Sequence, residues 1–277
     1  MRIGITFDVK DAVTAAIAAS GINPLPRTDD AMEEFDSPAT IEAIAAALRS
    51  HGHEVVLLGN GEAMLRKLLD PGRPRPDLVF NIAEGVGVGR SREARVPAVL
   101  EMLDIPYTGS DPLTLSVTLD KDVAKRYVAA AGVRVPQGVL VDAPASEARI
   151  AEKLDALPMP VIAKPCYEGS SKGIRDSSLI HDRRDLAAAV DRLRHDYRQP
   201  VLVEEFIDGD EVTVGLVGHP LSVLGVMRVL PQGKAAGKPF VYSLEVKRNW
   251  QELAKYECPA QLPAADLETI RRAAIAS

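Results

Sequence analysis

The sequence is poor in cysteine and in aromatic residues. Among its 277 residues, two are cysteine (Cys166 and Cys258), one is tryptophan, and only 4% are Phe, Trp or Tyr. Two cysteines cannot form a disulfide framework or a cysteine-based metal site, so we expect two free thiols. We also find no stripe of alternating aromatic and basic residues and no basic block, which argues against nucleic acid as a partner.

Long hydrophobic runs are also missing. No stretch approaches the roughly 20 apolar residues that cross a bilayer. The N-terminus "MRIGITFDV" lacks the apolar core of a signal peptide. With 46% hydrophobic residues and a net charge of −6, we expect a cytoplasmic protein with no membrane partner. At roughly 150 residues per domain, the length predicts about two domains.

The first 110 residues alternate between two kinds of pattern. Short apolar runs predict strands at 2–8, 53–59, 76–83 and 105–109, and amphipathic stretches predict helices at 37–52, 61–70 and 92–104. Such alternation predicts a parallel sheet covered on both faces, here an N-terminal α/β domain over 1–110. Residues 19–36 are rich in turn formers and acids, and we expect a loop or a poorly packed insertion there.

The rest of the chain predicts two α+β regions. Residues 111–200 form the first, with a helix from Asp111–Pro112 to the stop signal Gly132. It continues with strands at 133–142 and 158–165 and a helix at 146–157. Residues 201–277 form the second. There the strand-like runs at 200–207, 210–218 and 220–230 indicate an antiparallel meander, followed by a helix at 262–277.

The stretch "VIAKPCYEGSSKGI", residues 161–174, combines a strand with a small-residue loop. The strand ends at Lys164, and Gly169, Ser170 and Ser171 follow. Backbone N–H groups of such a loop can surround phosphate oxygens, and a lysine adds a point charge. The alternative is a surface turn with a solvated lysine. Lys172 is expected to face solvent.

Other motifs give this stretch a context. "DIPYTGSD", "LDKDVAKR" and "VEEFIDGDEVTV" occur in the order 104–111, 119–126 and 203–214, and "YECPAQL" follows at 256–262. This order resembles the D-alanine–D-alanine ligases of the ATP-grasp superfamily. The resemblance implies an ATP-grasp fold with a Rossmann-like N-terminal domain. It also implies a carboxylate–amine ligase that uses ATP and Mg²⁺ on amino-acid substrates in peptidoglycan biosynthesis for the cell wall, and a homodimer.

The resemblance also assigns nucleotide-binding roles. Lys121 and Lys164 would neutralise ATP phosphates, and Glu168, Gly169, Ser170 and Ser171 would form a flap over them. A hinge at Glu204, Glu205, Phe206 and Ile207 would hold adenine through backbone groups of Glu205 and Ile207, with Phe206 packed beside it. Simpler alternatives stay open. Glu204 and Glu205 would be an exposed strand end, and Lys121 a surface lysine.

Two further residues would complete the nucleotide site. Glu211 would accept hydrogen bonds from the ribose hydroxyls, since a carboxylate offers two acceptor oxygens. Lys247, in the closing loop "VYSLEVKRNW" at 241–250, would meet the γ-phosphate. The family often has a tyrosine after this lysine, whereas this chain has Arg248. The alternatives are a solvated turn acid and a charged surface loop with Trp250 packed beneath it.

The substrate pocket departs from the family pattern. "NIAEGVGVGRSREA", residues 81–94, is not G-x-G-x-x-G because position 90 is arginine, so we exclude a nicotinamide site. The ligases have a histidine–glycine motif here. This chain has no such histidine, and its substrate pocket would instead be lined by Glu84, Arg90, Arg92 and Glu93. The identity and stereochemistry of the amino acids stay open.

No metal ligands can be assigned. In the family, the carboxylates and the asparagine that hold Mg²⁺ lie on strands beyond the helix that follows "CPA", whereas this sequence stops at Ser277. Mg²⁺ needs such oxygen ligands. We therefore expect a fragment of a longer ligase, with poor turnover, or a degenerate homologue. The alternatives are a ligase for other amino acids or peptides and a non-catalytic nucleotide-binding protein.

Overall fold

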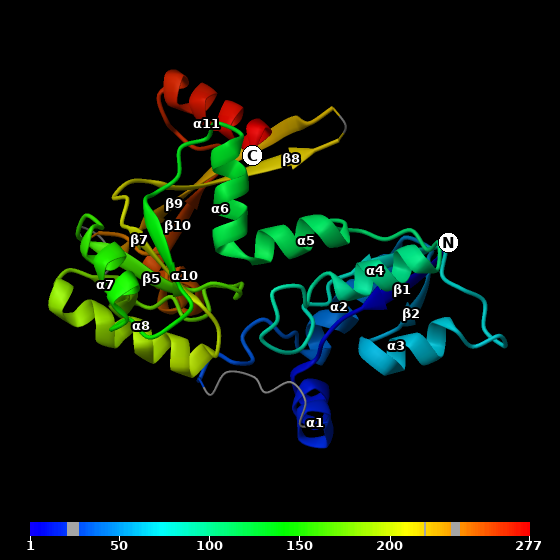
Figure 1. The fold of residues 1–277 in the computed structure, drawn as a ribbon. Helices are drawn as coiled ribbons and strands as arrows, with labels where there is room; N and C mark the ends of the chain where they lie inside the picture. The colour runs from blue at the N-terminus through cyan, green and yellow to red at the C-terminus, as the bar shows by residue number, and fades with distance from the viewer. Residues whose placement is uncertain (21–27, 219, 234–238) are drawn as a thin grey trace. The chain divides into compact units, whose positions relative to one another are not determined.

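The structure is a computed structural model that describes residues 1–20, 28–218, 220–233 and 239–277 (Figure 1). Its contacts divide the chain into two compact units. Unit 1 comprises Met1–Lys121 with Tyr167–Gly169 and Asp196–Arg198, and unit 2 comprises Asp122–Cys166, Ser170–His195 and Gln199–Ser277. No helix within the described ranges is both long and apolar enough to cross a membrane. Neither cysteine belongs to a disulfide, as expected.

Unit 1 is built on a three-stranded parallel sheet. Strands β1 (Arg2–Thr6), β2 (Glu54–Leu57) and β3 (Leu78–Asn81) have the order β2-β1-β3. Both neighbours pair with β1 in parallel, so the alternation of strands and helices predicted the sheet correctly. The predicted strand at 105–109 contributes only an isolated bridge between Tyr107 and Val79.

Both faces of this sheet are covered, as predicted. On one face Gly4 leaves room for Leu58 and Val79. That face packs against apolar residues of α3 (Gly61–Leu68) and α4 (Arg95–Met102). Side chains alternate along a strand, so Ile3 and Ile5 point to the other face, where they are 4% and 0% exposed.

Helix α2 (Pro38–Ser50) begins where the sequence predicts and ends two residues before the predicted stop at Gly52. The Ser37 hydroxyl accepts a hydrogen bond from the Thr40 N–H at 3.1 Å, and Pro38 occupies the first helical position. Beyond the helix Gly52 has φ +80°, a conformation that glycine adopts without strain. Ile41 and Ala45 form its buried face, and α2 packs against β2.

The loop predicted at 19–36 is confirmed over residues 28–36, which form turns, but the expectation of poor packing is wrong there. Residues 19–20 end helix α1 (Lys10–Ser20), and 21–27 lie outside the described residues. In residues 28–36, Ala31 and Phe35 are buried. Asp30 is also buried and accepts hydrogen bonds from the Tyr197 hydroxyl at 2.7 and 2.9 Å. The acids are therefore paired inside unit 1, which composition alone does not reveal.

The single helix predicted over 111–132 is also wrong. The structure has α5 (Pro112–Leu119) and α6 (Lys121–Ala130). They are separated by Asp120, whose backbone is extended (φ −83°, ψ 97°). The Asp120 side chain is 4% exposed and lies 3.3 Å from the Arg90 guanidinium. A buried, paired acid thus interrupts a pattern that is locally helical throughout.

Unit 2 contains a four-stranded antiparallel sheet. Its order is β4 (Gly138–Val141), β7 (Val201–Glu205), β5 (Val161–Pro165), β6 (Leu179–Ile180). Helices α7 (Ala148–Asp155) and α8 (Arg183–Tyr197) pack their apolar residues against it. A short 3₁₀ helix, η1 (Asp176–Ser178), precedes β6. The three-part division at 110 and 200 stays a prediction.

A second antiparallel sheet of unit 2 confirms the predicted meander. Strands β8 (Glu211–Val217), β9 (Ser222–Pro231) and β10 (Ala254–Glu257) have the order β10-β9-β8. The loop expected at 241–250 instead contains α9 (Leu244–Arg248), and α10 (Trp250–Leu253) begins at its end. The Ser243 hydroxyl caps α9 at the Val246 N–H. The predicted C-terminal helix is α11 (Ala264–Ala276).

Candidate active site

In unit 2, a buried glutamate links two lysines on the four-stranded sheet. Glu204 Oε2 lies 2.5 Å from Lys164 Nζ, and Glu204 Oε1 lies 2.9 Å from Lys125 Nζ. The glutamate side chain is 5% exposed, so the exposed strand end considered for Glu204 is wrong. Lys164 and Lys125 are 22% and 15% exposed. Two lysines and one glutamate leave one net positive charge, which suits a phosphate ligand.

The hinge residues follow directly on β7. The Glu205 N–H donates to the Gln137 carbonyl at 3.0 Å, and the Phe206 N–H donates to the Pro160 carbonyl at 2.9 Å. The Glu205 carboxylate accepts a bond from the Gln137 N–H at 2.8 Å. The Glu205 N–H is therefore engaged, and adenine recognition by Glu205 would use its carbonyl oxygen. The Ile207 side chain is exposed.

The small-residue loop after β5 has an unusual backbone. Ser170 and Ser171 have φ values of 48° and 61°, in the left-handed region that few non-glycine residues occupy. The Ser171 hydroxyl donates to the Tyr242 carbonyl at 3.0 Å. Consecutive strained residues often mark ligand-binding loops. Lys172, which was expected to face solvent, is 3% exposed, so that expectation is wrong.

Lys247 lies on helix α9. Glu211 is the first residue of β8, at the start of a strand as predicted. The ammonium of Lys247 is 5.2 Å from the centroid of the Tyr242 ring. Burial lowers the pKa of Lys247 below 10.5, while the negative charge of Glu211 acts in the opposite direction. Trp250 is 48% exposed, so the idea that it packs beneath this segment is wrong.

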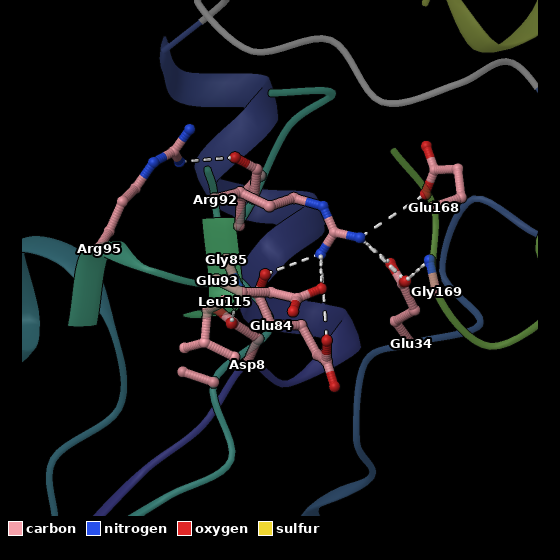
Figure 2. A network of polar contacts seen from close by, with 12 residues as sticks. Asp8, Glu34, Glu84, Gly85, Arg92, Glu93, Arg95, Leu115, Glu168 and Gly169 are labelled. Carbon is pink, nitrogen blue, oxygen red and sulfur yellow. Dashed lines mark hydrogen bonds and ion pairs between the residues drawn. The ribbon is translucent and has the colours of Figure 1, made fainter. Parts of the chain in front are cut away.

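In unit 1, Arg92 is the centre of a carboxylate network (Figure 2). Its side chain is 1% exposed. Its Nη2 donates to both Glu34 oxygens at 2.9 and 3.0 Å, and its Nη1 donates to the Glu84 carbonyl at 2.8 Å. Carboxylate oxygens of Glu93 and Glu168 lie 3.4 and 3.8 Å from the guanidinium. Arg92 therefore organises the surrounding acids, whereas the side chain of Arg90 is 63% exposed.

The flap residues Glu168 and Gly169 reach the same network. The Gly169 N–H donates to Glu34 Oε1 at 2.7 Å, and a Cβ at this position would lie 2.6 Å from that oxygen. Only glycine therefore fits here without movement. Lys121, the first residue of α6, donates from Nζ to the Glu168 carbonyl. The sequence-predicted residues Glu84, Arg92, Glu93, Lys121, Glu168 and Gly169 thus lie together.

Two acids of the network have raised pKa values. Burial, with repulsion from Glu93 and Glu34, raises the pKa of Glu84 to about 7. Burial also raises the pKa of Glu93, against the lowering effect of Arg92. Glu34, Glu84 and Glu93 are the one group of possible metal ligands among the described residues. Arg92 already contributes a cation among these carboxylates, so they do not fit as a resident Mg²⁺ site.

Sequence reasoning missed Asp8, Glu34, Lys125 and Tyr242. Asp8 is 6% exposed and accepts hydrogen bonds from the Asn60 amide and, at 2.9 Å, from the Gly85 N–H. Its place at the end of the strand predicted over 2–8 was the available signal. For Lys125, the available signal was its position four residues, or about one helical turn, after Lys121. Glu34 lies in the segment expected to be a loop, where no local pattern distinguishes it.

Comparison with solved structures defines the class of fold. The D-alanine–D-alanine ligase of Bacillus anthracis matches with a TM-score of 0.68 and 21% identity, over 100% of this chain and 77% of the other. The D-alanyl-alanine synthetase A of Vibrio cholerae matches with a TM-score of 0.70 and 16% identity, over 100% and 79%. The fold is that of the ATP-grasp ligases, as the motif order predicts.

Sequence comparison then defines the family. The model described as D-ala D-ala ligase C-terminus matches residues 128–277, more than half of the chain. The D-alanine–D-alanine ligases of Gluconobacter oxydans and Aquifex aeolicus are 34% and 35% identical over 81% and 75% of this chain. This chain belongs to the D-alanine–D-alanine ligase family. The matches cover 68% and 64% of the two relatives, so the chain spans about two thirds of their length.

Proposed function

We propose that this chain is part of an ATP-dependent ligase, which joins two amino acids through an acyl phosphate in the manner of D-alanine–D-alanine ligase. ATP would phosphorylate the carboxylate of one amino acid, and the amine of the second would displace phosphate to give a peptide bond. The observation that carries the proposal is the Lys164–Glu204–Lys125 arrangement in a chain of this family. It supports a phosphate site on the four-stranded sheet.

Within unit 2, each proposed role has a local basis. Lys164 would provide positive charge to the ATP phosphates, and the backbone N–H groups of Ser170 and Ser171 would donate to their oxygens. Glu211 would accept from the ribose hydroxyls at the start of β8. Lys247 would stabilise the charge of the transferred phosphoryl group.

Within unit 1, the carboxylate network would form the amino-acid site. Glu84 and Glu93 would face a substrate amine, since Arg92 is enclosed by carboxylates and is poorly placed to bind a substrate carboxylate directly. Lys121 would neutralise ATP phosphates, and Glu168 and Gly169 would begin the flap over them. A related structure is a D-Ala:D-Ser ligase, VanG of Enterococcus faecalis, so a second substrate other than D-alanine stays within the proposal.

Mg²⁺ belongs to the proposal as the ion that accompanies ATP and offsets the charge of its phosphates. No described residue is assigned to it, because the carboxylates that gather in unit 1 already surround Arg92. A ligase that uses ATP would act in the cytoplasm, and membership of this family supports a place in peptidoglycan synthesis for the cell wall. A homodimer stays a prediction that an experiment on molecular mass would decide.

Calorimetric titration with ADP and with a non-hydrolysable ATP analogue is the first test. It is combined with phosphate release and dipeptide detection, using Mg²⁺, ATP and a panel of D- and L-amino acids. Binding together with amino-acid-dependent release of phosphate and a dipeptide supports the ligase. Binding without release favours the alternative of a non-catalytic nucleotide-binding protein. Absence of binding overturns both.

A further inference from the structure

Three of the few aromatic residues in this chain form a connected series beside Lys247. The chain has one tryptophan and six tyrosines. The rings of Trp250 and Tyr256 have centroids 6.0 Å apart, and the Tyr256 hydroxyl lies 2.8 Å from that of Tyr242. The Lys247 ammonium lies 5.2 Å from the Tyr242 ring centroid. The series therefore connects Trp250 to the ammonium of Lys247.

Tyr242 is held at both ends. At its tip, the hydroxyl pairs with Tyr256 on β10. At its backbone, the carbonyl accepts the hydrogen bond from the Ser171 hydroxyl. The Phe240 ring also lies beside it, with centroids 6.3 Å apart. A ring fixed in this way offers a defined surface to a neighbouring cation.

The helix that carries Lys247 is attached to the same small-residue loop. The Leu244 N–H donates to the Ile174 carbonyl at 2.9 Å, and the Ser243 hydroxyl donates to Asp176 at 3.0 Å. These contacts, with the one between Ser171 and Tyr242, join residues 171–176 to residues 242–244. Both the ring and the lysine are thus placed relative to the loop that includes Ser170 and Ser171.

A lysine side chain needs such support to act at one place. Its four-carbon stem is flexible, and ordering it has an entropic cost. An aromatic face attracts the ammonium. Unlike a carboxylate in a close ion pair, it does not take up the N–H donors with a strong hydrogen bond, so they stay available for a ligand oxygen. Burial lowers the pKa of Lys247, and the charge of Glu211 opposes this effect.

We propose that Tyr242 is a positioning residue for Lys247. Its ring holds the ammonium in the direction of the γ-phosphate, and the Tyr256 hydroxyl fixes the ring. This inference rests on the proposed function, because it takes the γ-phosphate as the ligand of Lys247. It assigns Tyr242 no direct contact with the nucleotide. Its effect should therefore disappear when Lys247 is absent.

A double-mutant cycle tests the proposal through binding. The affinities of ADP and of a non-hydrolysable ATP analogue, each with Mg²⁺, are measured by calorimetry for the wild type, Tyr242→Leu, Lys247→Ala and the double variant. Tyr242→Phe and Tyr256→Phe separate the ring from the hydroxyl pair. Tyr127→Leu, at an exposed tyrosine of α6, is the matched control. Circular dichroism verifies folding, and the emission of the single tryptophan provides a second record of binding.

We expect Tyr242→Leu to weaken the ATP analogue about three- to tenfold while ADP binding stays unchanged. Tyr242→Phe should keep most of the wild-type preference for the ATP analogue over ADP, because it keeps the aromatic ring. The double variant should be no weaker than Lys247→Ala, which marks two residues acting through one interaction. The positioning role would be overturned if Tyr242→Leu kept the wild-type preference for the ATP analogue over ADP, or if it lost equal affinity for both nucleotides. It would also be overturned if the affinity losses of Tyr242→Leu and Lys247→Ala were additive in the double variant. If the wild type binds neither nucleotide, the proposed function has failed first.

Discussion

Arg92 and Glu34 form an ion pair that is almost entirely removed from solvent. Their side chains are 1% and 2% exposed, and one guanidinium nitrogen donates to both carboxylate oxygens at 2.9 and 3.0 Å. Glu34 Oε1 also accepts the Gly169 N–H at 2.7 Å. Removing either partner of a buried pair leaves the other charge without compensation, which is far more costly than losing a surface pair.

Arg92→Met should therefore destabilise unit 1 strongly. We expect a loss of about 3–5 kcal/mol in the free energy of unfolding, measured by urea denaturation. Arg66→Met is the matched control, because Arg66 pairs with Glu62 on the surface and both side chains are 77% exposed. The control should change stability by less than about 1 kcal/mol. Equal effects of the two substitutions would contradict the burial of Arg92.

The carboxyl of Glu84 should make stability depend on pH near neutrality. Its pKa is raised from 4.5 to about 7, mainly by burial. The folded protein therefore favours the protonated form, and this contribution is complete below pH 4.5 and lost as the pH rises through about 7. The side chain is 38% exposed, so solvent screening limits the effect to about 1 kcal/mol.

Glu84→Gln tests this directly, since glutamine has no proton to lose. The free energy of unfolding of the wild type should fall relative to that of the variant between pH 4.5 and 7.5. Two parallel curves over this range would show that Glu84 titrates normally. Glu62→Gln, at an exposed acid of α3, controls for the loss of one surface charge.

Lys164→Ala should remove most of the nucleotide affinity and leave the fold intact. Lys164 lies at the end of β5 before the small-residue loop, and its amine is partly exposed beside Glu204. The remaining Lys125–Glu204 pair has no net charge to offer a phosphate. Calorimetry with an ATP analogue measures the effect, with Lys153→Ala on α7 as the exposed-lysine control. Wild-type affinity in a folded Lys164→Ala variant would rule out the phosphate role.

Glu211→Gln should weaken ATP binding more modestly. One charge-assisted hydrogen bond to a ribose hydroxyl contributes about 1.5–3 kcal/mol. A 2′,3′-dideoxy analogue lacks both hydroxyls, so the wild type and the variant should bind it nearly alike. If the variant loses as much affinity for this analogue as for ATP, Glu211 acts elsewhere. Burial lowers the pKa of Lys247 and the charge of Glu211 opposes this lowering, so Glu211→Gln could act on ATP binding indirectly through Lys247.

Local sequence signals predicted the elements whose boundaries are set by short-range chemistry. Ser37 and Pro38 begin α2 because a side-chain cap and a fixed φ act within one turn. The apolar runs of the first region predicted the parallel sheet, and those after Asp210 predicted the meander of β8 and β9. In each case neighbouring residues in the sequence decide the outcome.

Some features of the candidate site could also be predicted from local patterns. The lysine near the end of β5 and the glycine and serines that follow it indicated a phosphate loop. Glu84, Arg90, Arg92 and Glu93 were predicted to line one pocket because they stand where the resembling ligases have their histidine–glycine motif. The structure brings Glu84, Arg92 and Glu93 into one network but makes Arg92 its buried centre rather than a surface that binds substrate.

Which charged groups are buried, and which partners they have, depends on long-range packing that local patterns do not show. Asp120 ends α5 through its buried position beside Arg90, Glu34 joins Arg92 across 58 residues, and Lys172 is buried. Tyr242 meets Ser171 across 71 residues. Such pairs form when folding removes both polar groups from water. Their stability depends on the distance in space between two residues that are far apart in the sequence, which a local pattern does not contain. Local patterns thus predicted most of the elements and the motif order predicted the family, whereas packing set the environment of each site residue.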